Sequence, residues 1–156
     1  MKPRKLIVPL AALGGLAGWY LFRPELLFVD RRVNETLPVT AAEASAPLLA
    51  GVFHSNAHET RGRVTVHRLA DGGLALRLAE FATSNGPDVR VYLVAAPDVT
   101  DDETPARAGF VDLGPLKGNV GDQNYTIPGG TDLSRFRAVS IWCRRFSVNF
   151  GAAPLS

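Results

Sequence analysis

Hydrophobic and polar residues alternate along most of the chain after Leu48. In residues 64–67, 74–78 and 89–93, every second side chain is a valine or a leucine, and most positions between them are polar or small. Because successive side chains of a strand point to opposite faces of a sheet, this period of two predicts half-buried strands. Further strands are predicted toward the C-terminus, near Phe110–Leu113, Tyr125–Ile127, Ala138–Cys143 and Phe146–Phe150.

Residues that favour turns separate these runs. Asp71-Gly72-Gly73 is a tight hairpin signal, and residues 84–87 and 128–130 indicate loops. Helix is predicted only as a turn over residues 131–136, which Thr131 or Asp132 would cap. Many short strands at this spacing are typical of an all-β domain, an antiparallel sandwich or barrel, and we assign it to residues 48–156.

The N-terminus has a different pattern. Residues 6–22 form an uncharged apolar run that is long enough to cross a hydrocarbon core of about 30 Å. Basic residues in segment 1–5 precede it, so the positive-inside rule predicts a cytoplasmic N-terminus and an extracytoplasmic domain, periplasmic or at the cell surface. Residues 23–47 are predicted to be a juxtamembrane segment and a tether, since 33–47 is rich in Ala, Glu, Thr and Pro.

A cleaved signal peptide is the alternative interpretation of residues 6–22, because it has the same basic start and apolar stretch. Signal cleavage needs small residues at the exit. The chain has Trp19, Tyr20, Phe22 and then Pro24 there. The sequence therefore favours an uncleaved anchor, a single transmembrane helix ahead of the domain.

Charge limits the class of partner. The sequence pI of about 9.0 is basic, but the positive charge is concentrated in and beside the apolar run. From Val33 onward the chain has 11 Lys and Arg against 13 Asp and Glu, a net charge of −2. No basic face for phosphate is implied, so we predict no nucleic-acid partner.

Several motifs of the region 48–156 resemble the DM13 domain family in order and spacing. They are Gly51-x-Phe53, His58-x-x-x-Gly62, Gly86-Pro87-Asp88, Leu116-Lys117-Gly118-Asn119 with Tyr125, and Ile141-Trp142-Cys143 followed by Phe146, Val148 and Phe150. The resemblance implies a β-sandwich, held outside the cytoplasm in membrane-anchored bacterial members. It also implies a role in electron transfer or thiol redox chemistry, centred on the residue that corresponds to Cys143.

Cys143 is the only cysteine, so it cannot close a disulfide within its own chain. If residues 138–143 are one strand, it shares a face with Val139 and Ile141, and apolar surroundings keep a thiol inert. Alternatively, Arg144 or Arg145 stabilises a thiolate by folding back. A reactive thiol here would form a sulfenic acid, a mixed disulfide with a partner, or a bond to a metal or haem.

Other residues are candidates for supporting roles. Trp142 and the two arginines would shape the pocket of Cys143, and Lys117 would stabilise its thiolate. For Lys117 the competing interpretation is an irregular turn that leads into the strand of Tyr125, whose hydroxyl binds backbone. His58 is predicted to fix the loop before Gly62, and His67 to face solvent.

The sequence predicts no cofactor and no metal site. Haem is the alternative left open. Met1 is the only methionine, so the iron ligands would be a bis-His or a Cys–His pair, and no Cys-x-x-Cys-His attachment motif is present. Motifs of hydrolases and transferases are also missing, which leaves enzymatic activity undecided but favours a protein that is not an enzyme, such as a redox partner protein. The acidic residues 98–103 are interpreted as a solvated loop.

Two functions follow. The first is a membrane-anchored domain that exchanges electrons or thiol equivalents with a redox or envelope protein through Cys143. The alternative is a non-catalytic interaction module, in which exposed loops bind the partner and Cys143 fills the core.

Overall fold

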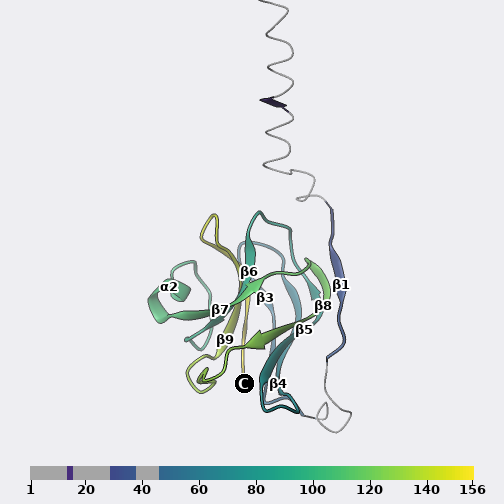
Figure 1. Ribbon diagram of the computed structural model, residues 1–156. Coiled ribbons are helices and arrows are strands. Elements are labelled where there is room, and N and C mark those ends of the chain that lie inside the picture. The colour runs from purple at the N-terminus through teal and green to yellow at the C-terminus, as the bar shows by residue number, and fades with distance from the viewer. Residues whose placement is uncertain (1–13, 16–28, 38–45) are drawn as a thin grey trace, which may run out of the picture.

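The computed structural model describes residues 14–15, 29–37 and 46–156, and these form two packed sheets (Figure 1). Each sheet has five strands, in the orders β1-β8-β5-β4-β2 and β3-β10-β9-β6-β7. The predicted β-sandwich is confirmed, and its first strand lies ahead of the predicted domain 48–156. The bounds are β1 Arg32–Asn34, β2 Leu49–Val52, β3 His54–Ser55, β4 Arg61–Arg68, β5 Leu74–Ala82, β6 Val89–Val94, α2 Thr104–Ala108, β7 Phe110–Pro115, β8 Val120–Ile127, β9 Ala138–Cys143 and β10 Val148–Pro154.

The predicted hairpin joins β4 to β5. The Leu69 amide donates to the Gly73 carbonyl over 2.8 Å, and the Asp71 carboxylate accepts from the Gly73 amide at the same distance. Alternation of side chains then places Val64, Val66 and the leucines of β5 in the interior. Hydrophobic pattern and turn chemistry thus set the register of this pair together.

β9 lies between β6 and β10, and all six of its residues are buried. Val139, Ile141 and Cys143 belong to the core between the sheets. Ala138 and Trp142 belong to a smaller apolar cluster with Tyr92, Val94 and Val99. Since adjacent residues of a strand face opposite ways, sheet β3-β10-β9-β6-β7 is covered on both faces at β9.

The acidic residues 98–103 form a loop, as predicted, and the helix α2 follows them directly. The Asp101 carboxylate accepts from the amides of Glu103 (2.9 Å) and Thr104 (2.6 Å) in the turn that leads into the helix. At residues 131–136 the chain makes hydrogen-bonded turns, with the Phe136 amide donating to the Asp132 carbonyl. The five residues of α2 are too few to produce a periodic pattern in the sequence, so this helix was not predicted.

β1 lies inside the segment that the sequence assigned to the tether. It pairs with β8 in parallel, Val33 opposite Gly121, so this one pair departs from the antiparallel pattern. A Cβ at Gly121 would lie 2.0 Å from the Val33 carbonyl oxygen, and one at Gly118 would lie 2.3 Å from that of Arg31. The two glycines therefore permit the close approach of β1, which composition alone does not reveal.

No helix within the described residues is long and apolar enough to cross a bilayer. The predicted transmembrane segment 6–22 lies outside those residues except for 14 and 15, as do residues 1–5 and most of 23–47.

The prediction that His67 faces solvent is wrong. Its side chain lies on the outer side of β4 but is only 7% exposed, with Nε2 2.9 Å from Thr65 Oγ1. Burial and the nearby Arg77 charge lower the pKa of His67, because both disfavour the imidazolium. Alternation identifies the face of a strand on which a residue lies and does not tell whether that face is covered.

Candidate functional site

Cys143 is the last residue of β9 and is 1% exposed. In the ladders it is opposite Val89 of β6 and Val148 of β10. All three belong to or pack on the core between the sheets, and side chains directly opposite in an antiparallel pair lie within about 5.5 Å at Cβ. Cys143 is therefore a buried core thiol at the end of its strand.

The two valines that flank Cys143 also line surface hollows. Val148 lines a groove of about 180 Å³ with His58, Pro87 and Phe146. Val89 lines a second hollow of about 160 Å³, and the two hollows share Asn85 and Gly86. The thiol is thus one side chain away from the surface at the end of the sandwich. We call Val89 and Val148 the valine cover.

Trp142 does not line the surroundings of Cys143, although the sequence analysis assigned it to that pocket. It points to the opposite face of β9, where its ring stacks on Tyr92 with centroids 6.0 Å apart. Tyr92 in turn stacks on Phe110 at 4.2 Å. Neighbours in a strand sequence face opposite ways, so the Trp-Cys pair is divided between two clusters.

The arginines after Cys143 lie in an exposed hairpin turn. Arg144 Nε donates to Asp88 Oδ2 over 2.8 Å, and its amide donates to the Asp88 carbonyl over 2.9 Å. The hydrogen bond to Asp88 and the negative charge of its carboxylate raise the pKa of the Arg144 guanidinium. Arg145 is exposed and has no ion pair within the described residues. Neither guanidinium contacts the thiol.

His58 lies in the loop before Gly62, as predicted. Its ring packs on Phe150 with centroids 3.9 Å apart, and its amide donates to the Phe150 carbonyl over 3.1 Å. Its own carbonyl accepts from Thr60 Oγ1 over 3.2 Å. The side chain and backbone of His58 therefore hold the loop against β10.

The other histidines have separate partners. His54 Nε2 lies 2.9 Å from Asp98 Oδ1, and His67 contacts Thr65. Within the described part of the chain, no group of three or more His, Cys, Asp or Glu side chains is placed to hold a metal ion.

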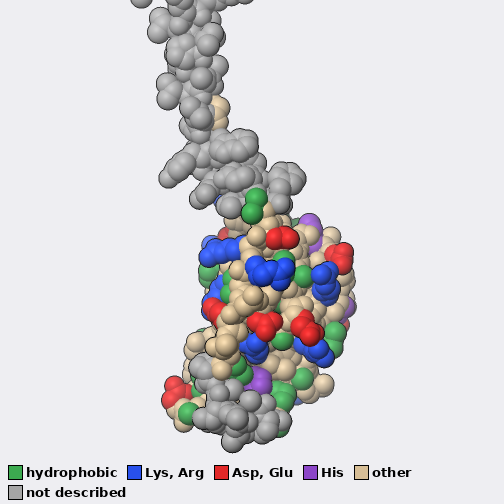
Figure 2. Space-filling model, turned by 90° about the vertical axis from the view of Figure 1, so that its right-hand side faces the viewer, with side chains coloured by type: hydrophobic (Ala, Val, Ile, Leu, Met, Phe, Trp, Pro, Cys, Tyr) green, Lys and Arg blue, Asp and Glu red, His purple; other side chains and the backbone are tan. Residues whose placement is uncertain are grey.

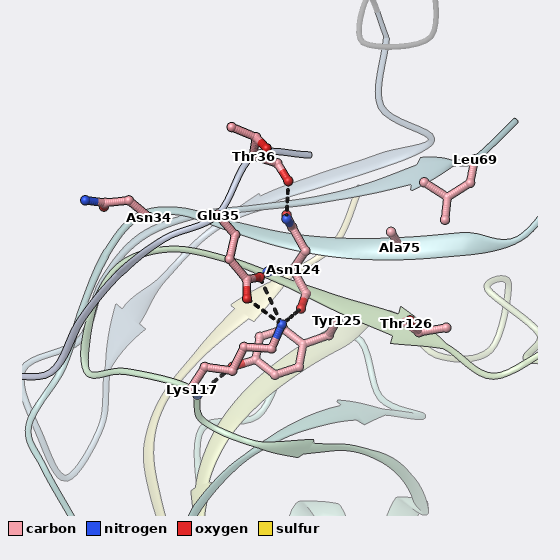
Figure 3. Close-up of a pocket in the computed structure, with 9 residues that line it drawn as sticks. All are labelled: Asn34, Glu35, Thr36, Leu69, Ala75, Lys117, Asn124, Tyr125 and Thr126. Atoms are coloured by element: carbon pink, nitrogen blue, oxygen red, sulfur yellow. Dashed lines mark hydrogen bonds and ion pairs between the residues drawn. The ribbon is translucent and has the colours of Figure 1, made fainter. Parts of the chain in front are cut away.

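Lys117 is directed toward the chain that leads into the domain (Figure 3). Its Nζ lies 2.9 Å from both carboxylate oxygens of Glu35 and donates to the Asn124 carbonyl over 2.7 Å. It also lies 5.3 Å from the centre of the Tyr125 ring. These residues border an open hollow of about 560 Å³. Lys117 thus fastens Glu35 to β8 and is not a partner of the Cys143 thiol.

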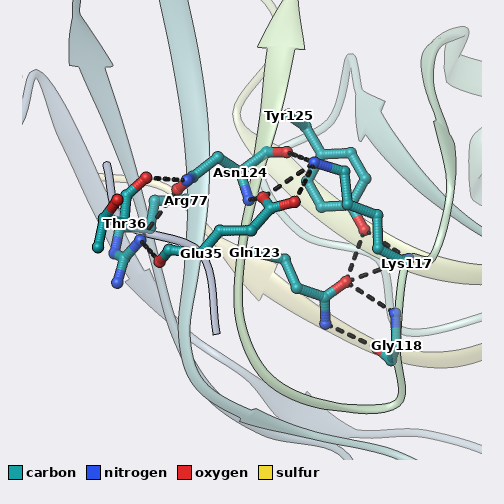
Figure 4. A network of polar contacts seen from close by, with 8 residues as sticks. All are labelled: Glu35, Thr36, Arg77, Lys117, Gly118, Gln123, Asn124 and Tyr125. Atoms are coloured by element: carbon teal, nitrogen blue, oxygen red, sulfur yellow. Dashed lines mark hydrogen bonds and ion pairs between the residues drawn. The ribbon is translucent and has the colours of Figure 1, made fainter. Parts of the chain in front are cut away.

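Gln123 connects this ion pair to the core (Figure 4). It is 0% exposed, and its Oε1 accepts from the amides of Lys117 and Gly118, each over 3.1 Å, and from the Tyr125 hydroxyl over 2.8 Å. The Tyr125 hydroxyl accepts from the Lys117 amide, and burial raises the pKa of Tyr125 to about 12. Tyr125 therefore has the packing role that the sequence suggested for it. Gln123 was missed, although it occupies an inward position of β8.

The outer face of sheet β1-β8-β5-β4-β2 is a mixed-charge surface (Figure 2). Arg63 pairs with Glu80 over 2.6 Å, and Arg77 pairs with Asp122. Arg77 also donates to the Glu35 carbonyl over 3.0 Å. Surface pairs of this kind contribute little stability individually, but both members of the Arg77–Asp122 pair also bind the Glu35 backbone, since the Asp122 carbonyl accepts from the Glu35 amide over 2.9 Å.

The contact between Glu35 and Lys117 is expected to depend on pH. The Lys117 hydrogen bond is the main cause of a lowered pKa at Glu35, with a smaller contribution from the Asn124 amide. A carboxylate with a lowered pKa stabilises the fold above its unfolded value of 4.5, and this contribution is lost as pH falls through the folded pKa. We therefore expect the Glu35 amide, which donates to Asp122, to lose exchange protection in acid.

Hydrogen exchange of that amide, corrected for the intrinsic rate, measures the effect at pH 7 and at pH values below 4.5. Glu35→Gln is the control, because it keeps the shape and removes the titration. Equal loss of protection in both chains would show that Glu35 is not the titrating group.

Comparisons with known proteins identify the family of the domain. No curated protein and no solved structure matches the chain. A sequence model described as "Electron transfer DM13" matches residues 52–155, two thirds of the chain and nearly the whole sandwich. The resemblance that the motifs indicated is confirmed at the level of the domain, and the chain belongs to the DM13 family.

Proposed function

We propose that this protein is a membrane-anchored DM13 protein, with residues 6–22 as an uncleaved transmembrane helix and the sandwich outside the cytoplasm. The apolar run, the basic residues before it and the bulky residues after it support this topology. The domain carries out electron transfer as thiol redox chemistry with a redox or envelope protein. The family description supports electron transfer, and Cys143 is the only thiol available for it.

A single thiol acts by exchange with a disulfide of the partner. The Cys143 thiol loses its proton, its sulfur attacks one sulfur of the partner's disulfide, and the other partner sulfur leaves as a thiolate, which takes up a proton. The product is a mixed disulfide between Cys143 and the partner. A thiol of a second, reduced dithiol protein then attacks the Cys143 sulfur, and the partner leaves with both of its thiols reduced. The other thiol of the dithiol protein displaces Cys143 from the new mixed disulfide, which restores the Cys143 thiol, oxidises the dithiol protein to a disulfide and completes the transfer of two electrons to the partner.

The position of Cys143 at the end of β9 carries this proposal. The residues of β9 before Cys143 are flanked by β6 and β10, whereas the residues after it form the exposed turn 144–147. Opening of the last ladder pair and of the valine cover would expose the sulfur without unfolding the sheets. Local openings of this kind cost less free energy than global unfolding.

The non-catalytic interaction module is the second candidate. The 1% exposure of Cys143 and the ion pair between Arg144 and Asp88 favour it, because a buried thiol without a cationic partner is not activated. In this case the partner binds exposed loops, and Cys143 contributes only packing.

Trapping of mixed disulfides in intact membranes separates the two candidates. Membranes are quenched with acid, alkylated, and separated without reductant, and adducts are identified by mass spectrometry. The redox function predicts an adduct that contains Cys143 and is lost in Cys143→Ser. Binding of the same partner by both chains, with no adduct, would favour the interaction module. Mass spectrometry of the mature N-terminus tests the anchor, since a terminus beyond Phe22 would show cleavage.

A further inference from the structure

One end of the sandwich gathers the entry of the chain, the loop 84–88 and the turn 144–147 (Figure 1). We call it the entry end. Asn85 Nδ2 donates to the Val29 carbonyl over 3.0 Å, which holds Val29, the first residue of the described stretch 29–37, at this end. The Arg144 amide donates to the Asp88 carbonyl, which joins the turn to the same loop. The three segments therefore lie together.

The entry end has exposed apolar side chains beside basic ones. Phe146 is 65% exposed at the turn and Val29 is 60% exposed, the second and third most exposed of the large hydrophobic residues that the structure describes. Arg144 and Arg145 precede Phe146 directly, and both are exposed. Arg144 is paired with Asp88, whereas Arg145 has no ion pair within the described residues. An aromatic ring next to guanidinium groups suits the boundary between lipid headgroups and acyl chains, where the ring is buried and the cations contact phosphate.

Chain length brings this end close to a bilayer. The predicted transmembrane segment ends at residue 22 and the described stretch 29–37 begins at Val29, so six residues lie between them. Six residues span at most about 20 Å when fully extended. The entry end is thus restricted to the neighbourhood of the membrane surface, whereas the turn at 128–130 lies at the opposite end of β9.

We propose that the 144–147 turn seats Phe146 in the lipid interface, with Arg145 against anionic headgroups. This proposal rests on the membrane anchor of the proposed function. The occupant is lipid, because the anchor holds this end near the bilayer at high effective concentration and the exposed Arg145 guanidinium matches the charge of anionic headgroups. The contact fixes the orientation of the domain, with β9 ending toward the membrane and Cys143 on the membrane side.

Depth measurement by electron paramagnetic resonance tests the proposal in the full chain. A nitroxide is attached at Phe146→Cys, with Cys143→Ala to leave a single thiol, in nanodiscs of phosphatidylcholine and phosphatidylglycerol. Gly129→Cys in the same background is the matched control, since a side chain there meets open space at the far end. Collision of each label with oxygen and with a water-soluble nickel chelate gives its depth.

We expect the label at 146 to be several-fold richer in oxygen collisions relative to nickel collisions than the label at 129, and shallower in discs without phosphatidylglycerol. Equal aqueous exposure of both labels, in chains that co-elute with the discs, would overturn the proposal and leave the anchor intact. Chains that do not co-elute with the discs would refute the anchor itself, and with it the premise of this contact.

Discussion

Replacement of Gln123 by alanine is expected to lower the free energy of unfolding by about 4 kcal/mol. The side chain is fully buried, and its Oε1 accepts three hydrogen bonds while its Nε2 donates to the Gly118 carbonyl over 2.6 Å. Alanine leaves the amides of Lys117 and Gly118 and the Gly118 carbonyl without these partners in the interior, and opens a cavity as well. Both effects act in the same direction.

Urea denaturation followed by circular dichroism measures this loss. Thr126→Ala is the control in the same strand, because Thr126 is exposed and points outward. We expect it to change stability by less than about 0.5 kcal/mol. A loss below about 1 kcal/mol for Gln123→Ala would mean that water replaces the amide, and that Gln123 does not organise the turn.

Replacement of Val148 by alanine is expected to raise the rate of Cys143 alkylation about tenfold in the folded protein, because the valine cover thins on one side. A loss of about 1.4 kcal/mol in the free energy of local opening corresponds to this factor. Alkylation with iodoacetamide, followed by mass spectrometry after quenching, measures the rate.

Val66→Ala distinguishes the cover from general destabilisation. Val66 is 0% exposed and lies in β4, in the other sheet. Like Val148→Ala, Val66→Ala lowers the free energy of global unfolding, but it leaves the valine cover intact. We therefore expect its Cys143 alkylation rate in water to stay near that of the wild type. An equal increase in both variants would mean that the thiol is reached only through global unfolding.

The sandwich could be predicted because its evidence is local. Alternation at Val64–Val66 and at 89–93, together with the turn at 71–73, indicates strands and one register without knowledge of the rest of the chain. β1 could not be predicted in this way. Its three residues pair with β8 only because Gly118 and Gly121 leave room for them, and this contact joins positions almost 90 residues apart.

Within the candidate site, the burial of Cys143 follows from its phase with Val139 and Ile141. The same phase argument, applied to Trp142, would have placed its ring on the opposite face. The partners of the charged residues are less accessible to sequence reasoning. Arg144 pairs with Asp88 and Lys117 with Glu35, because tertiary contacts between distant segments select one of many available carboxylates.

The denaturant dependence of Cys143 alkylation in the intact wild-type protein tests the proposed function most directly. Ile141→Cys in a Cys143→Ser chain is the reference, because it places a thiol on the same face of β9, two residues farther from the turn. If Cys143 reacts through opening of the strand end, its rate in low urea is nearly independent of urea, while the rate at position 141 rises with the full slope of global unfolding. The same steep slope at both positions would contradict a redox thiol reached from the folded state, and would leave Cys143 as a core residue of an interaction module.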